Sequence, residues 1–245
     1  MSDPMMPDFL KLALYMLIVF YSNVVQALTG FAGVMLSIPP LILLYGPDTA
    51  KGVINILSWL ICLLIAWQNR QYTQWKQVRH IVLYMLAGMM LGIFLYRHID
   101  ASFLVPFYGL IIVCVALKNL FLKPQDRPLP EWIYTLVLFG AGIIHGMFVS
   151  GGALLVIYLA AKFKDKYLFR ANVASVWCIV NLLLIGADFQ KGIYTAQFFK
   201  MTALGLIPLA LALWTGNKIH RRINQTAFRR VTYVLLLAAG SSILL

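Results

Sequence analysis

Long apolar stretches alternate with short polar, Gly or Pro interruptions along the whole chain. Stretches such as 81–96, 103–117 and 132–149 approach or reach the ~20 residues that a helix needs to cross a hydrocarbon core of ~30 Å. This pattern predicts an all-α, polytopic integral membrane protein. The segments that we delimit are 9–29, 31–45, 50–67, 78–96, 103–121, 131–149, 153–163, 171–187, 198–217 and 228–245.

Two of these segments, 31–45 and 153–163, are too short to cross at full depth. At a rise of ~1.5 Å per residue, about 15 helical residues span only roughly 22 Å. The first of the two also contains Pro39 and Pro40. We therefore expect half-helices or re-entrant hairpins there, and about eight to ten membrane segments in all.

Residues that recur at a fixed offset indicate an internal duplication. Matched pairs are Gln26 with His145, Gly33 with Gly152 and Lys51 with Arg170 at an offset of about 119, and Gly92 with Gly216 at about 124. We predict two inverted repeats, 1–125 and 126–245, that together form one membrane domain. Each repeat would contain a Gly-broken helix or hairpin and three transmembrane helices.

The distribution of charge predicts the orientation. If the segments alternate across the bilayer, fifteen of the 20 Lys and Arg residues lie on one side. The other side receives only Lys11, Lys51, Arg97, Lys191 and Lys200. By the positive-inside rule the crowded side is cytoplasmic, and both termini are periplasmic. Equivalent loops of the two copies then face opposite sides, as in transporters that use inverted repeats for alternating access.

Composition argues against other classes of protein. Hydrophobic residues make up 62% of the chain and charged residues 11%, where soluble domains carry about 25% charge. A net charge of +12 would indicate a nucleic-acid partner in a soluble protein, but here the basic residues lie in loops between spans, so none is expected. Cys62, Cys114 and Cys178 lack paired spacing, and the sequence predicts neither a metal site nor a cofactor.

Candidate chemistry lies at two Gly-containing breaks deep in apolar sequence, residues 26–33 and 145–152. Non-helical backbone at membrane depth must be satisfied by protein or by a water-filled cavity. A helix that restarts after a break directs unpaired N–H groups and a positive dipole end into that cavity, which suits an anion. Close packing of glycines between helices is the alternative explanation.

Other polar side chains lie within the spans, either lining a cavity or forming interhelical hydrogen bonds. These are Asn55, Ser58, Asn172, Ser175 and Asn181. His145 could relay protons beside an anion, or could be a neutral core histidine. Lys51 and Arg170 begin the segments after the breaks, where a side chain that snorkels to the interface is the expected role.

Three stretches resemble the TauE/SafE sulfite exporter (TSUP) family. They are 30–33 (GFAG) followed by Pro39, its second copy over 142–152, and 170–175 (RANVAS). The resemblance covers essentially the whole chain, with Ala32 and Val149 where the family often has Gly. It implies a bacterial or plant transporter of sulfite, sulfonates, sulfoacetate or a related sulfur-containing anion.

Together these features predict a secondary transporter of such an anion in the bacterial inner membrane, working by alternating access at the breaks. Its partners would be the anion and the lipid bilayer, with protons as a candidate coupling ion. No residue is predicted to be catalytic. The predicted substrate-binding residues are Gln26, Thr29, Gly30, Phe31, Gly33, Asn55, His145, Ser150, Gly151, Gly152, Asn172 and Ser175.

The alternatives that stay open are an intramembrane hydrolase that uses Ser150 and His145, and a membrane scaffold or passive anion channel. The hydrolase is disfavoured because residues five apart on a helix lie on different faces. In addition, no acidic residue is positioned to orient the histidine. A channel would show no trans-stimulation of flux, which distinguishes it from a transporter.

The predicted orientation can be tested at the C-terminus. A reporter that works only in the periplasm, fused after Leu245, is expected to be active. Activity of a cytoplasmic reporter at the same position would contradict the inverted-repeat orientation.

Overall fold

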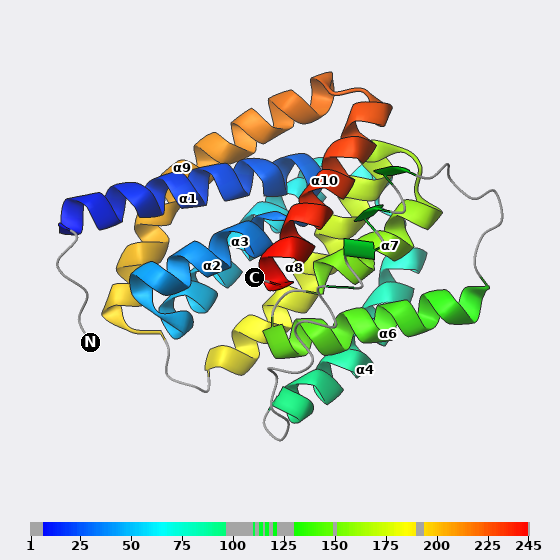
Figure 1. Ribbon diagram of the computed structural model, residues 1–245, viewed down its shortest axis with the longest axis horizontal. Coiled ribbons are helices and arrows are strands. Elements are labelled where there is room, and N and C mark those ends of the chain that lie inside the picture. Colours follow the sequence, from blue (N-terminus) through cyan, green and yellow to red (C-terminus); the bar gives the residue numbers. More distant parts are fainter. Residues whose placement is uncertain are drawn as a thin grey trace.

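The computed structural model describes residues 7–96, 110, 113–114, 116–117, 120–121, 130–148, 151–189 and 194–244. Within these residues the regular elements are helices and there is no strand, which confirms the predicted all-α class (Figure 1). The predicted segment 103–121 lies mostly outside the described residues. The elements are α1 (Asp8–Thr29), α2 (Gly33–Tyr45), α3 (Pro47–Gln68), η1 (Arg70–Tyr72), α4 (Trp75–Tyr96), α6 (Glu131–Phe148), α7 (Gly152–Lys162), α8 (Lys166–Phe189), α9 (Ala196–Arg222) and α10 (Gln225–Leu244).

Local sequence sets where several helices begin and end. Gly30 adopts a left-handed conformation with φ of 90°, and its N–H donates to the carbonyl of Gln26 at 2.7 Å, which ends α1. The Thr195 hydroxyl accepts a hydrogen bond from the backbone N–H of Phe198 at 3.2 Å and caps α9. Asp165 caps α8 in the same way through its carboxylate.

Helix lengths divide the elements into spans and short helices. α1, α3, α4, α8 and α9 are long and apolar enough to cross a membrane. By contrast, α2 has 13 residues and α7 has 11. These two lengths agree with the half-helices expected for 31–45 and 153–163.

The helix contacts of the first half of the chain recur in the second half, with α1, α2, α3 and α4 corresponding to α6, α7, α8 and α9. α1 packs along α9, and α4 packs along α6 at the opposite edge of the molecule (Figure 1). α3 packs on α8 between these pairs. The short helix α2 contacts α1 and α3, and α7 contacts α6 and α8. Within its apolar window α8 is 67% buried, the highest share among the long helices.

Glycines bring α4 and α6 into backbone contact. A Cβ added at Gly88 would lie 2.1 Å from a carbonyl oxygen of α6, and one added at Gly142 would lie 2.1 Å from a carbonyl oxygen of α4. Gly92 and Gly146 repeat this arrangement one turn further along. Such small-xxx-small spacing lets membrane helices approach closely. Close helix packing, the alternative explanation for the break glycines, therefore applies to Gly142 and Gly146.

Large apolar side chains cover the outer surface of the described bundle. Examples are Leu83 (68% exposed), Met90 (73%), Trp132 (64%), Ile207 (62%) and Trp214 (63%). An apolar surface of this extent needs lipid rather than water around it. Together with the five spans, it confirms that the chain is a polytopic membrane protein.

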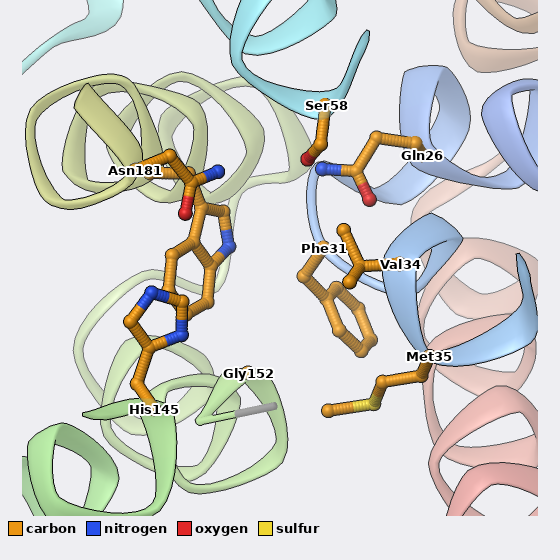
Figure 2. A pocket seen from close by; sticks show the side chains of 9 residues that line it. Gln26, Phe31, Val34, Met35, Ser58, His145, Gly152 and Asn181 are labelled. Carbon is orange, nitrogen blue, oxygen red and sulfur yellow. The ribbon is translucent and has the colours of Figure 1, made fainter. Parts of the chain in front are cut away.

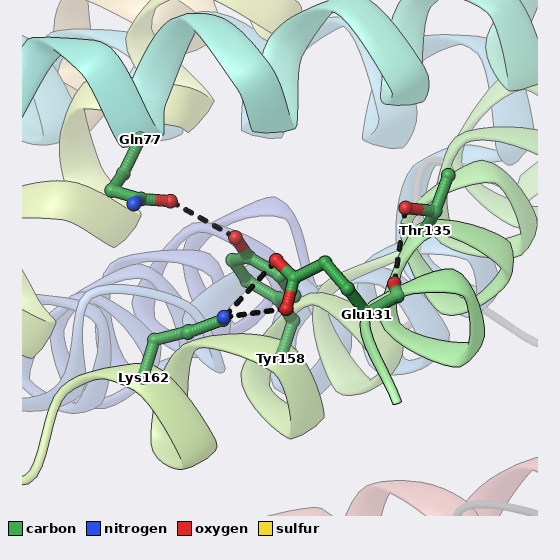
Figure 3. Close-up of polar contacts among 5 residues, drawn as sticks. All are labelled: Gln77, Glu131, Thr135, Tyr158 and Lys162. Carbon is green, nitrogen blue, oxygen red and sulfur yellow. Dashed lines mark hydrogen bonds and ion pairs between the residues drawn. The ribbon is translucent and has the colours of Figure 1, made fainter. Parts of the chain in front are cut away.

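Polar contacts fix the outer end of α7 to its neighbours (Figure 3). The ammonium of Lys162, the last residue of α7, lies 2.8 Å from the carboxylate of Glu131 at the start of α6. The Tyr158 hydroxyl donates to the side-chain carbonyl of Gln77 on α4 at 3.0 Å. Because Glu131 is exposed, this ion pair orients α7 more than it stabilises the fold.

The backbone contact between α4 and α6 predicts the cost of adding one methyl group. Gly142→Ala is expected to destabilise the protein by about 1–3 kcal/mol, the usual cost of overpacking, because the helices must move apart. Gly186→Ala is the matched control, since no atom of the described residues lies within 4 Å of a Cβ added there in α8. It should be neutral or stabilising by up to ~1 kcal/mol. Thermal unfolding of both variants in one detergent measures the difference, and equal melting temperatures would contradict the close approach.

Candidate functional site

The side chain of Gln26 holds the first break together. Its carbonyl oxygen accepts a hydrogen bond from the backbone N–H of Gly33, the first residue of α2, at 2.8 Å. Its amide nitrogen donates to the carbonyl of Gly30 at 3.2 Å and contacts the sulfur of Cys62 on α3 at 3.2 Å. Gln26 is only 1% exposed. One buried amide therefore satisfies backbone groups on both sides of the break, as membrane depth requires.

The glycines of this break permit close approach of backbones. A Cβ at Gly33 would lie 2.6 Å from the carbonyl oxygen of Ser22, because α2 turns directly back onto α1. A Cβ at Gly30 would meet Val173 of α8 at 3.2 Å, in addition to the strain of its positive φ. The first break is thus packed tightly against α1 and α8.

The second break lies between Phe148, where α6 ends, and Gly152, where α7 begins. Gly151 packs against α6, since an added Cβ would lie 2.2 Å from the carbonyl oxygen of Ala141. Gly152 differs, because its neighbours are the ends of the Met35 and Trp177 side chains at 3.2 and 3.4 Å. The N-terminus of α7 therefore borders an interior space.

The two breaks meet at one cavity, which we call the central cavity (Figure 2). It contains about 280 Å³ of space between atoms, but this space is so narrow that it admits only about one water-sized sphere. His145 and Asn181 lie on one side and Phe31, Val34 and Met35 on the other. The lining residues are Gln26, Phe31, Val34, Met35, Ser58, His145, Gly152, Trp177 and Asn181.

Four polar side chains of this lining have buried atoms without a hydrogen-bond partner in the described part of the chain. They are the Ser58 hydroxyl, both ring nitrogens of His145, the Trp177 indole nitrogen and the Asn181 carbonyl oxygen. Each of these residues is at most 5% exposed. The ring of His145 lies beside that of Trp177, with centroids 4.8 Å apart. Asn181 is near enough to His145, and Ser58 to Cys62, to interact weakly. The Trp177 indole has no such neighbour among the described residues, and buried polar groups are nearly always paired, so this cluster is equipped for a polar ligand.

The chemistry of the central cavity favours an anion. The indole N–H of Trp177 can only donate a hydrogen bond, and the Ser58 hydroxyl and the His145 ring can donate as well. None of the described lining residues is acidic, which disfavours a cation. The positive end of the α7 dipole lies at Gly152 and adds to this preference. No cluster of His, Cys, Asp or Glu suited to a metal ion occurs among the residues that the structure describes.

The structure brings some of the predicted binding residues together and not others. Gln26, Phe31, His145 and Gly152 line the central cavity. The other residues at or near the breaks stand outside its lining: Thr29, Gly30, Gly33, Asn55 and Gly151. Ser150 lies outside the described residues, so its proposed pairing with His145 is not tested.

Asn172 and Ser175 form contacts elsewhere. The side chain of Asn172 accepts a hydrogen bond from the backbone of Gln74 at 2.9 Å and donates to the carbonyl of Tyr72 at 3.2 Å. The Ser175 hydroxyl lies 3.2 Å from that of Thr73. Both residues thus anchor the connection between η1 and α4 onto α8.

Sequence reasoning missed Val34, Met35 and Trp177. Tryptophan is common in apolar spans, so Trp177 carries no signal alone. Its spacing of four residues from Asn181 does, because residues at i and i+4 of a helix share a face. A polar residue and an indole donor on one face of a span are a combination that sequence could have revealed.

The expectation for Arg170 was wrong. This residue is 3% exposed and its guanidinium donates to the side chain of Asn217 on α9, so it does not extend to the interface. The start of α8 at Lys166, several residues before the predicted boundary at 171, places Arg170 inside the first turns of the helix.

Comparison with known proteins gives a consistent result. The family model described as "Sulfite exporter TauE/SafE" matches residues 15–243. The chain is also similar to the "Probable inner membrane transporter protein TsaS" of Comamonas testosteroni, with 26% identity over 194 residues that cover 78% of this chain and 81% of the relative. No solved structure matches the chain.

Proposed function

Because the chain belongs to the sulfite exporter TauE/SafE family, we propose that it is a secondary transporter that carries a small sulfur-containing anion through the central cavity by alternating access. The family and the named relative are transporters, so the chain is a membrane transporter and not an enzyme. Both descriptions therefore disfavour the intramembrane hydrolase.

The observation that carries the proposal is the cluster of unpaired polar groups at the central cavity. Sulfite and sulfonate oxygens accept hydrogen bonds and cannot donate them when ionised. Ser58 approaches from α3, His145 from α6, and Trp177 from α8, so donors reach one small ligand from three helices. Hydrogen bonds to a charged group are about twice as strong as neutral ones.

The apolar wall of the cavity adds to the specificity that we propose. Phe31, Val34 and Met35 face the polar groups and offer no hydrogen bond. This wall would contact the organic part of a sulfonate, while the polar side binds its oxygens. A flexible Met35 at the mouth of the second break can adjust to ligands of different size.

Alternating access is supported by the equivalent contacts that corresponding helices of the two halves make. Trp59 of α3 donates to the carbonyl of Cys178 of α8 at 3.1 Å, and these residues are 119 positions apart, the offset of the predicted repeat. Gly92 packs α4 against α6, and its partner Gly216 packs α9 against α1. Contacts of this kind are expected around an axis that relates two inverted repeats.

The narrowness of the central cavity favours a transporter over a passive channel. A channel needs a continuous water-filled path in its conducting state, whereas a transporter can close around its site. Unlabelled sulfite inside liposomes should therefore accelerate the uptake of labelled sulfite. Uptake that does not respond to internal sulfite would favour a channel.

We propose the bacterial inner membrane as the location. The relative from Comamonas testosteroni is named an inner membrane transporter protein, and the described spans are of bilayer length. The excess of Lys and Arg on one predicted side supports periplasmic termini.

Removal of one donor should weaken anion binding selectively. Trp177→Phe keeps the ring but loses the indole N–H, and a hydrogen bond to a charged group contributes about 1.5–3 kcal/mol. We expect the sulfite concentration for half-maximal uptake to rise roughly tenfold or more. Trp214→Phe, at a lipid-facing position that is 63% exposed, is the matched control and should leave uptake unchanged. Equal uptake by both variants and the unmodified protein would remove the central cavity as the site.

Proton coupling through His145 has its own test. If the ring is protonated together with the anion, uptake should fall as the pH rises and the ring loses its proton. His145→Gln keeps hydrogen-bonding capacity but cannot change charge, so it should flatten this dependence. The measurement is initial uptake by proteoliposomes between about pH 5.5 and 8.0, with equal pH on both sides. An unchanged profile in His145→Gln would leave the histidine with a structural role only.

A further inference from the structure

A second, wider cavity opens where α3 ends, α8 begins and α9 ends. Its volume is about 410 Å³, and we call it the vestibule. Arg70, Arg170 and Arg221 line it, together with amide side chains such as Asn69 and Asn217. None of the described residues that line it is acidic. By the predicted orientation, the vestibule lies on the cytoplasmic side.

Arg170 is the residue of the vestibule whose burial and incomplete hydrogen bonding indicate a ligand. It is 3% exposed, and its guanidinium donates to the side-chain carbonyl of Asn217, whose amide donates in turn to Gln68 at 2.9 Å. Its Nε atom is buried without a partner in the described part of the chain. No carboxylate among the described residues forms an ion pair with it. A buried guanidinium without an opposite charge is costly unless an anion completes it.

Lys166, one turn earlier on α8, shows how the chain pairs a buried cation when its role is structural. It is 8% exposed, and its ammonium donates to the carbonyls of His220 at 2.7 Å and of Ile223 at 2.5 Å. These carbonyls belong to the C-terminal end of α9, where a positive charge is favourable. The charge of Lys166 therefore caps a helix, whereas that of Arg170 has no equivalent partner.

The same face of α8 reaches the central cavity. Arg170 and Trp177 are separated by about two helical turns, so their side chains share a face roughly 10 Å apart along the axis. Gly30 of the first break packs on this part of α8, because a Cβ added there would be 3.2 Å from the Val173 side chain and 3.4 Å from the carbonyl oxygen of Arg170. An anion held at Arg170 would thus lie about two turns of α8 from Trp177 of the central cavity.

We propose that the vestibule is a second anion-binding site, in which Arg170 and the exposed Arg221 bind a small oxyanion before it enters or after it leaves the central cavity. The guanidinium fork of Arg170 suits two oxygens of one sulfur oxyanion. The surrounding positive charge concentrates such anions at this face. The identity of the anion rests on the proposed function, while the site itself rests on Arg170.

The test measures sulfite binding to the purified full-length chain by the thermal stabilisation that a ligand of the folded state produces. The background is Trp177→Phe, which weakens the central cavity, and sulfite should still stabilise this protein. Adding Arg170→Lys, which keeps the charge but loses the fork, or Arg221→Gln should raise the apparent dissociation constant about tenfold. Arg230→Gln removes the same charge as Arg221→Gln from an exposed position on α10, and should bind sulfite as the background does.

Unchanged sulfite affinity in both Arg170→Lys and Arg221→Gln would overturn the vestibule site. An equal loss in Arg230→Gln would also overturn it, because net charge alone would then explain the effect. Stabilisation by phosphatidylglycerol but not by sulfite would assign the cavity to a lipid phosphate instead. Because Arg221 is exposed, its variant keeps the test valid even if Arg170→Lys fails to fold. Sulfite binding that depends on Arg170, without any sulfite uptake by liposomes, would contradict the proposed transport function but support the vestibule site.

Discussion

Backbone groups at the end of α1 and the start of α2 need partners inside an apolar bundle, and the amide of Gln26 supplies them. This requirement shapes the rest of the site. Because both ends of the Gln26 amide bond to the break, its side chain is committed to structure although it lines the central cavity. The free polar groups there come instead from α3, α6 and α8. The anion site that we propose is thus built around the break rather than from the backbone of the break itself.

The positions of the helices could be predicted from sequence because an apolar run of bilayer length has few other solutions. The two breaks could also be located, since Gly30 requires a positive φ and Gly33 a close approach. The side of a helix that faces the cavity could not be predicted from the sequence. Asn172 and Trp177 are both apparent in the sequence, but only tertiary packing decides that Asn172 anchors η1 while Trp177 reaches the cavity.

Helix α8 connects the parts of the molecule that carry chemistry. Its first turns hold Lys166 and Arg170, and the middle of the helix holds Trp177 and Asn181. The helix packs on α3 and contacts α4 and α7. A single, mostly buried helix therefore sets the distance between the vestibule and the central cavity. Its start at Lys166 was hidden in the sequence, because a charged residue at the edge of an apolar run usually marks a loop.

The glycine crossing of α4 and α6 determines which parts of the bundle can move. Where side chains separate two helices, a shift of an ångström or two can be absorbed by changes of rotamer. At Gly88 and Gly142 the two backbones are in direct contact. No side chain between them can change its rotamer, so we expect the two helices to move as one rigid body. Any opening of the central cavity is then expected at contacts made by flexible side chains, such as that of Met35 with the start of α7. The stiffness of one helix pair would thus confine the motion of the proposed transport cycle to the opposite wall.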